Sequence, residues 1–158
     1  MSEIRQSDGG RSPDTAPPAV SVVLITYNRK PLLRETVASI LNQTFSDFEL
    51  IVVDNVSEDG TERFVRSLDD PRVRYIRHPN GGVISINRNV GIRAARGDYI
   101  AFCDDDDLWV PDKLQRQIRA MEDNPRAGLC FTDGVAFRED PAAAVFGYVF
   151  GRDHSHQR

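Results

Sequence analysis

The chain has 158 residues, of which 40% are hydrophobic and 28% are charged, and its formal net charge is −4. This length and composition suit one globular domain with a sizeable core. A negative net charge argues against a general binder of nucleic acid or of anionic membranes, since both need a basic surplus. No apolar run approaches the roughly 20 residues of a membrane-spanning helix.

Residues 1–18 are rich in Ser, Pro, Gly and charged residues, which predicts a disordered leader. This stretch lacks the apolar core of a signal peptide, so we expect a cytoplasmic protein, with peripheral attachment to a membrane left open. Cys103 and Cys130 are the only cysteines, far apart and each within an apolar run. We expect two small buried thiols rather than a disulfide or a metal site.

Short apolar runs alternate with helical patterns from residue 20 onward. The first run, VSVVLITY, is β-branched and nearly continuous, which is typical of a strand covered on both faces. Gly91 weakens one of the helical patterns. We expect strands at 20–27, 48–55, 73–78, 98–104 and 127–137, and helices at 31–43, 60–68, 83–95 and 111–122. This alternation predicts an α/β fold with a mostly parallel sheet and helices on both faces.

Polar side chains follow three of the predicted strands. Ligands of parallel sheets bind beyond the carboxyl ends of the strands, so these side chains are expected to share one site rather than to mark three separate turns. They are Thr26, Asn28 and Arg29 after the first strand, Asp54 and Asn55 after the second, and Asp104, Asp105, Asp106 and Asp107 after the fourth.

The run of four aspartates predicts a site for a divalent cation. Two such charges 4 Å apart in water repel by about 1 kcal/mol, a cost that a bound cation would remove. Carboxylates suit Mg²⁺ or Mn²⁺, which are often shared with substrate phosphates. The segment 80–89, NGGVISINRN, fits neither common Gly-rich phosphate loop, so a nucleotide would be held by side chains and metal. Asp54 could accept a hydrogen bond from a base N–H, or it could cap the turn that follows.

Two long stretches resemble the donor-binding part of family 2 glycosyltransferases, which have the GT-A fold. They are SVVLITYNRKPLLRETVASILNQTFSDFELIVVDNVSEDGTERFV and NRNVGIRAARGDYIAFCDDDDLWVPDKL. The likeness covers about residues 19–135. It implies an inverting enzyme that uses a nucleotide-diphosphate sugar, UDP- or dTDP-linked, with Mn²⁺ or Mg²⁺ as cofactor. The implied acceptor is a hydroxyl of a glycan, a lipid-linked glycan or a small molecule, with no nucleic acid partner.

The resemblance also implies roles for individual residues. Asp54 matches the carboxylate that reads a pyrimidine base, and Asp106 matches the direct metal ligand. Asp107 is interpreted as part of the following turn. The remaining matches are Thr26, Tyr27 and Asn28 in the first nucleotide-contacting turn, Arg88 and Asn89 near the phosphates, and Asp104 and Asp105 at the ribose and a metal-bound water, with Asp104 also a metal ligand. Asn55 and Val56 depart from the frequent Asp-Gly of the family, a departure that bears on donor preference.

The resemblance further implies that the chain is truncated on the acceptor side, because family members continue well beyond this length. We divide it into a leader (1–18), a nucleotide-sugar-binding domain (19–137) and an unassigned segment (138–158). The general base is not found; Glu139 and Asp140 are interpreted as a solvated turn. Two alternatives stay open: a nucleotide- and metal-binding module without transferase activity, and a nucleotidyltransferase, which the absence of a Gly-rich loop after the first strand disfavours.

Overall fold

The computed structural model describes residues 16–136. The chain divides into two compact units, Met1–Gln115 and Arg116–Arg158, and each is described by itself. Residues 1–15 of the expected leader and the whole segment 138–158 lie outside the described residues, so the domain boundary near residue 137 stays a prediction. None of the helices in the described part has the length and apolar character that crossing a membrane requires.

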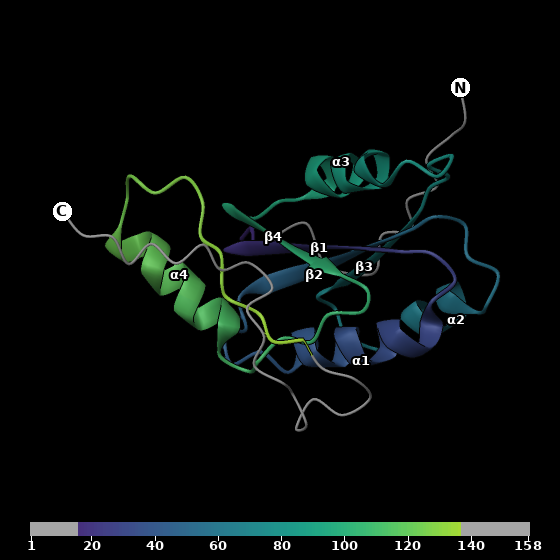
Figure 1. The fold of residues 1–158 in the computed structure, drawn as a ribbon, viewed down its shortest axis with the longest axis horizontal. Helices are drawn as coiled ribbons and strands as arrows, with labels where there is room; N and C mark the ends of the chain where they lie inside the picture. Colours follow the sequence, from purple (N-terminus) through teal and green to yellow (C-terminus); the bar gives the residue numbers. More distant parts are fainter. Residues whose placement is uncertain (1–15, 137–158) are drawn as a thin grey trace. The chain divides into compact units, whose positions relative to one another are not determined.

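The first unit contains a sheet of parallel strands (Figure 1). The strands lie in the order β3-β2-β1-β4, and each neighbouring pair runs parallel. They are β1 (Val20–Thr26), β2 (Phe48–Asp54), β3 (Val73–Arg77) and β4 (Tyr99–Asp104). The predicted parallel α/β architecture is confirmed, and the strand limits agree with the sequence to within one residue.

Helices cover both faces of this sheet, as Figure 1 shows. One face carries α3 (Ile84–Ala94), and the other carries α1 (Lys30–Leu41) and α2 (Thr61–Arg66). Every residue of the central strand β2 is buried, which is the burial expected for a strand covered on both sides. The fourth helix, α4 (Lys113–Asp123), contains the boundary between the two units.

Gly91 allows α3 to approach β1 closely. A Cβ atom at this position would lie 2.3 Å from Cγ1 of Val23, far inside van der Waals contact. The glycine that weakens the helical pattern in the sequence is therefore required by packing, because any larger residue would push the helix off the strand.

A buried carboxylate joins the amino-terminal parts of the strands. Glu49 is fully buried and accepts hydrogen bonds from Ser21 Oγ at 2.8 Å, Arg74 Nη1 at 3.0 Å and Arg96 Nη2 at 2.7 Å. Burial pushes the pKa of Glu49 upward, but the hydrogen bonds from Arg96, Ser21 and Arg74 outweigh it and leave the pKa lowered. Glu49 is thus held as an anion that ties β1, β2 and β3 to the segment after α3.

The second unit does not contain the strand expected at 127–137. Residues 127–136 form no strand, and Leu129 and Phe131 are largely exposed, so the prediction was wrong for the described part. An apolar, β-branched run becomes a strand only where a neighbour pairs with its backbone, and strand propensity alone does not supply one. Cys103 is buried as expected, whereas Cys130 is partly exposed, and both thiols are free.

Candidate functional site

A cavity of about 380 Å³ opens at the carboxyl edge of the sheet. The parallel register brings the strand ends together there, since Thr26 pairs with Asp54 and Ile25 pairs with Asp104. The predicted site residues that line this cavity are Thr26, Tyr27, Arg29, Asn55, Arg88, Asp104, Asp105 and Asp106. Side chains that follow β1, β2 and β4 meet at this cavity, as the sequence led us to expect, whereas Asn28, Asp54 and Asp107 are outside its lining.

Asp105 is fixed by hydrogen bonds inside the protein. It is buried, and its Oδ2 accepts from Thr26 Oγ1 at 2.8 Å while its Oδ1 lies 3.3 Å from Arg29 Nη1. Its backbone carbonyl accepts from Thr36 Oγ1 of α1 at 3.0 Å. Asp105 therefore connects the ends of β1 and β4 to α1, and both of its carboxylate oxygens already have partners.

Asp104 and Asp106 are about half exposed on the wall of the cavity, and each pairs with an arginine. Arg29 Nη1 contacts Asp106 Oδ2 at 3.0 Å, so the same nitrogen bridges Asp105 and Asp106. Arg88 Nη2, from α3, contacts Asp104 Oδ1 at 2.8 Å. These two arginines supply counter-charge to three neighbouring carboxylates.

At Asp107, the repulsion from the neighbouring carboxylates is not offset. Partial burial and the charges of Asp104 and Asp106 raise the pKa of the Asp107 carboxyl above its ordinary value of 3.8. Its backbone N–H bonds to the carbonyl of Asp104 at 3.3 Å, which places Asp107 at the end of the turn, as the sequence suggested. Burial and the charge of Asp107 also raise the pKa of the neighbouring Cys103 thiol, which stays neutral.

Asp54 lies outside the cavity lining. It is fully buried; its Oδ1 accepts from the N–H and the hydroxyl of Ser57, at 3.0 and 2.5 Å, and its Oδ2 accepts from the Tyr75 hydroxyl at 2.5 Å. Burial and the hydrogen bond to Asp54 raise the pKa of Tyr75. These contacts are those of the turn-cap alternative, and the residue that faces the cavity after β2 is Asn55.

Asn28 and Val56 shape the turns that follow β1 and β2. Both have positive φ angles, 51° and 61°, in the left-handed region that a β-branched residue rarely adopts. Asn28 Oδ1 accepts from the Glu58 N–H, and the Asn28 N–H donates to Ser57 Oγ, both at 2.8 Å. Asn28 thus clamps the two turns together and does not line the cavity, so its expected nucleotide contact stays a prediction.

The asparagine of α3 that lines the cavity is Asn87, to which the sequence gave no role, and not Asn89. Asn89 is exposed and outside the lining, whereas the buried Asn87 is part of it. Asn87 Nδ2 donates to the carbonyl of His78 at 3.1 Å, and its Oδ1 lies 3.0 Å from Nδ1 of the same histidine. Asn80 also lines the cavity and received no role from the sequence, although the turn NGG at 80–82 marks its position.

The carboxylates of the cavity can be compared with the ligand set that the expected cation needs. Among the described residues, no three His, Cys, Asp or Glu side chains lie close enough to hold a metal ion by themselves. Mg²⁺ and Mn²⁺ in nucleotide sites commonly use one or two carboxylates together with substrate phosphates and water. The exposed oxygens of Asp104 and Asp106 fit that kind of shared site.

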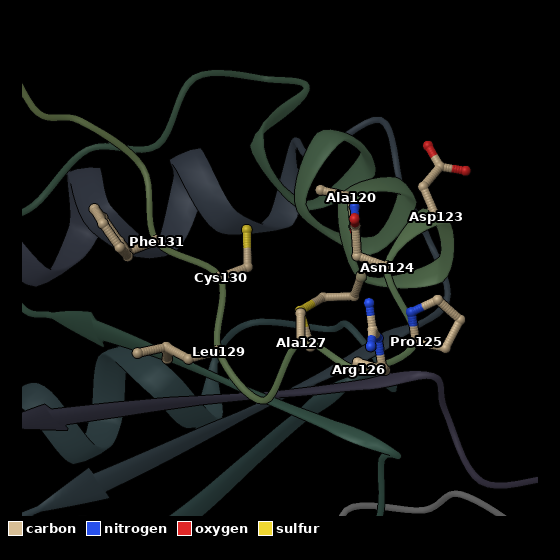
Figure 2. Close-up of a pocket in the computed structure, with 10 residues that line it drawn as sticks. Ala120, Asp123, Asn124, Pro125, Arg126, Ala127, Leu129, Cys130 and Phe131 are labelled. Carbon is tan, nitrogen blue, oxygen red and sulfur yellow. The ribbon is translucent and has the colours of Figure 1, made fainter. Parts of the chain in front are cut away.

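A larger pocket, of about 750 Å³, lies within the second unit. Figure 2 shows that its lining comes from the last turns of α4 and from the segment after them. Asp123, Arg126 and Cys130 contribute there, and none of the predicted site residues does. The candidate site is therefore the cavity at the sheet edge.

The fold and the site define a class: a parallel α/β domain with an acidic, arginine-paired cavity at the carboxyl edge of its strands. The family model described as Glycosyl transferase family 2 matches residues 21–142. The chain belongs to this family, and the expected GT-A fold is confirmed by solved structures that resemble it.

Curated relatives and solved structures resemble part of this chain. The Escherichia coli protein named UDP-Glc:alpha-D-GlcNAc-diphosphoundecaprenol beta-1,3-glucosyltransferase WfaP is 37% identical over 65% of this chain and 41% of its own length. Staphylococcus aureus TarS 1–349, solved with UDP, is 27% identical over 67% of this chain and 32% of its own, with a TM-score of 0.63. Pyrobaculum calidifontis PcManGT, solved with GDP-Man and Mn²⁺, is 28% identical over 70% of this chain and 34% of its own, with a TM-score of 0.61. The chain spans less than half of the length of the curated relatives it matches.

Proposed function

We propose that this chain forms the donor-binding part of a glycosyltransferase that transfers a sugar from a nucleotide-diphosphate sugar to an acceptor hydroxyl. The observation that carries the proposal is the cavity at the sheet edge, where carboxylates and arginines gather at one end and amide side chains at the other. Family membership and the nucleotides named in the titles of the neighbours support it. The acceptor is a glycan, a lipid-linked glycan or a small molecule.

The strand order divides the cavity into two ends. Because β1 lies between β2 and β4, residues after β2 and residues at the end of β4 are two strand spacings apart, about 10 Å. We place the diphosphate at the charged β4 end and the nucleoside toward β2. Tyr27 lines the cavity with about half of its surface exposed, so its ring is available to stack on a base.

At the charged end, Asp106 and Asp104 would hold Mn²⁺ or Mg²⁺ together with the diphosphate. The bound ion would supply positive charge that stabilises the nucleoside-diphosphate leaving group. Arg88 and Arg29 line the same cavity, and their guanidinium groups have the planar donor geometry that binds phosphate oxygens. Thr26 orients Asp105, which in turn positions Arg29.

The proposed reaction is an inverting displacement. The acceptor oxygen bonds to the anomeric carbon as the bond from that carbon to the diphosphate breaks, and the hydroxyl proton passes to a carboxylate base. That base is unassigned in this chain. The second candidate is a module that binds donor and metal without transfer, because the cavity supplies side chains for binding and no base is assigned to it.

Calorimetric titration of the full chain with UDP and CDP, with and without Mn²⁺, tests the binding part of the proposal. We expect binding that tightens at least tenfold with Mn²⁺. Equal affinity with and without Mn²⁺ would contradict the role of the metal. Failure to bind either nucleotide would contradict the assignment of the donor site. Incubation with a panel of nucleotide sugars and acceptors then separates the two candidates, since the module reading requires binding without release of nucleoside diphosphate.

A further inference from the structure

The uncharged end of the cavity is formed by two asparagines whose oxygens are already engaged. Asn55, the first residue after β2, accepts a hydrogen bond from the backbone N–H of Asn80 with its Oδ1, at 2.9 Å. Asn80 uses its own Oδ1 to accept from the backbone N–H of Gly82 at 2.8 Å. Both asparagines line the cavity.

The orientation of both amides follows from these partners. A backbone N–H can only donate, so the atom that faces it must be the amide oxygen and the NH₂ group must point elsewhere. Within residues 16–136, neither Asn55 Nδ2 nor Asn80 Nδ2 has a hydrogen-bond partner. Asn80 is nevertheless buried, with only 7% of its surface exposed. A buried amide donor without a partner is costly, which indicates that a ligand acceptor completes it.

The other amide on this wall offers no acceptor. Asn87 directs both its oxygen and its nitrogen to His78. The Asp54 carboxylate, which would have supplied an acceptor, is turned into the protein by Ser57 and Tyr75. Among the described residues 16–136, the β2 end of the cavity therefore presents amide N–H groups to a ligand, and each side-chain amide oxygen in its lining already has a partner.

We propose that Asn55 and Asn80 determine base specificity, selecting a nucleobase through ring acceptors rather than through a ring N–H. This inference rests on the proposed function and refines it. Cytosine presents two adjacent acceptors, N3 and O2, whereas uracil carries a proton on N3. The chain should therefore bind cytidine diphosphate at least as tightly as uridine diphosphate, in contrast to the UDP or dTDP preference that the sequence suggested through Asp54.

The test is the ratio of the dissociation constants for UDP and CDP, measured with Mn²⁺ on the full chain by calorimetry. In the wild type we expect CDP to bind as tightly as UDP or more tightly. Asn55→Asp keeps an oxygen for the Asn80 N–H but replaces the free N–H donors with an acceptor that repels cytosine N3 and accepts from uracil N3–H. The preference should then shift toward UDP by about tenfold, the effect of one mismatched buried hydrogen bond.

Asn42→Asp is the matched control, because Asn42 is an exposed residue at the C-terminus of α1, outside the cavity lining, and undergoes the same chemical change. It should leave the UDP to CDP ratio unchanged. A wild type that prefers UDP by tenfold or more would overturn the inference, and so would a ratio that Asn55→Asp does not move. Both results would leave the proposed function standing, whereas a wild type that binds neither nucleotide would overturn both.

Discussion

Asp105 differs from its three acidic neighbours in the direction of its oxygens. Thr26 and Arg29 occupy both of them, and the side chain is buried, whereas Asp104 and Asp106 reach the cavity from half-exposed positions. Repulsion between neighbouring like charges alone would make the four aspartates equivalent. The contacts make them unequal, because Arg29 and Arg88 neutralise three of them and not the fourth.

Replacing each aspartate by asparagine should therefore have different effects on the ligand-free protein. Asp105→Asn leaves Arg29 without its buried partner and should lower the free energy of unfolding by about 1–3 kcal/mol. Asp106→Asn should be close to neutral, since its pair with Arg29 is exposed. Urea unfolding at pH 7 measures both changes, and equal effects at the two positions would contradict the assignment.

Asp107→Asn should stabilise the protein at neutral pH. The pKa of the Asp107 carboxyl is raised in the folded state, so ionisation of this group opposes folding. The protein therefore loses stability as the pH rises from the ordinary pKa of 3.8 through the raised value. The variant lacks this loss. Its advantage over the wild type should be present at pH 7 and should disappear below the ordinary pKa of 3.8, which unfolding curves at pH 3 and pH 7 compare. An advantage that is equal at both pH values would show a cause other than ionisation.

Val56 stores backbone strain in the turn beside Asn55. A β-branched residue with φ near 61° costs roughly 1–2 kcal/mol, and a glycine there removes that cost while adding up to about 1 kcal/mol of chain entropy. Val56→Gly should therefore be neutral to stabilising by about 1 kcal/mol in thermal unfolding. Val110→Gly is the control, because Val110 is an exposed valine without a positive φ and should be destabilised by the same change. Equal losses of stability at both positions would contradict the assignment of backbone strain to Val56.

At the scale of elements, the amino-terminal parts of the strands depend on one buried anion. Glu49→Gln leaves Arg74 and Arg96 without their charged partner and should lower the free energy of unfolding by about 3 kcal/mol. Because the pKa of Glu49 is lowered on folding, its contribution is present above the ordinary value of 4.5 and is lost as the pH falls through the folded value. Unfolding curves from pH 3 to pH 7 should show a shallower acid loss in the variant. Glu62 forms an exposed ion pair with Arg66, so the control Glu62→Gln should change the free energy of unfolding by less than about 1 kcal/mol.

The contact between α3 and β1 determines how far α3, the helix that carries Arg88, lies from the sheet. Gly91→Ala places a methyl group against Val23 and should destabilise the protein by about 1–3 kcal/mol, despite the better helix propensity of alanine. Val23→Ala removes the atoms in conflict. In a double-mutant cycle by urea unfolding, the double variant should be less destabilised than the sum of the two single variants. Strict additivity would show that the two positions do not press on each other.

Element types and limits could be predicted because their signals are local. Apolar periodicity and Pro or Gly positions located four strands and four helices. The strand expected at 127–137 failed because a strand needs a partner, which a local pattern cannot report. The sequence placed both Asp54 and Asn55 at the site and left open whether Asp54 contacts a base or caps the turn. Which of the two faces the cavity could not be read from the sequence, because successive side chains at a strand end point to opposite sides. Arg29 stood in the expected cluster, yet its contact with two aspartates distant in the chain is visible only in three dimensions.

At the scale of the whole molecule, the site is assembled from four segments that the chain visits one after another. They are the turn after β1, the turn after β2, the turn after β3 together with the first part of α3, and the turn after β4. Their cavity-lining residues fall within 25–29, at 55, within 80–88 and within 104–106. The buried network around Glu49 lies at the opposite end of the same strands. A ligand that binds the folded state stabilises what it contacts, by about 2.7 kcal/mol at a concentration 100 times its dissociation constant.

Hydrogen exchange measured with and without CDP and Mn²⁺ should therefore show a pattern that the sequence order does not suggest. We expect slower exchange in all four edge segments together, because one ligand contacts them at once. Amides near Ser21 and Arg74, at the far end of the strands, should change little under conditions where exchange occurs by local opening. Protection confined to residues 116–136 would move the site to the second unit and its larger pocket, and protection at a single edge segment would show that the cavity does not bind the nucleotide as one site.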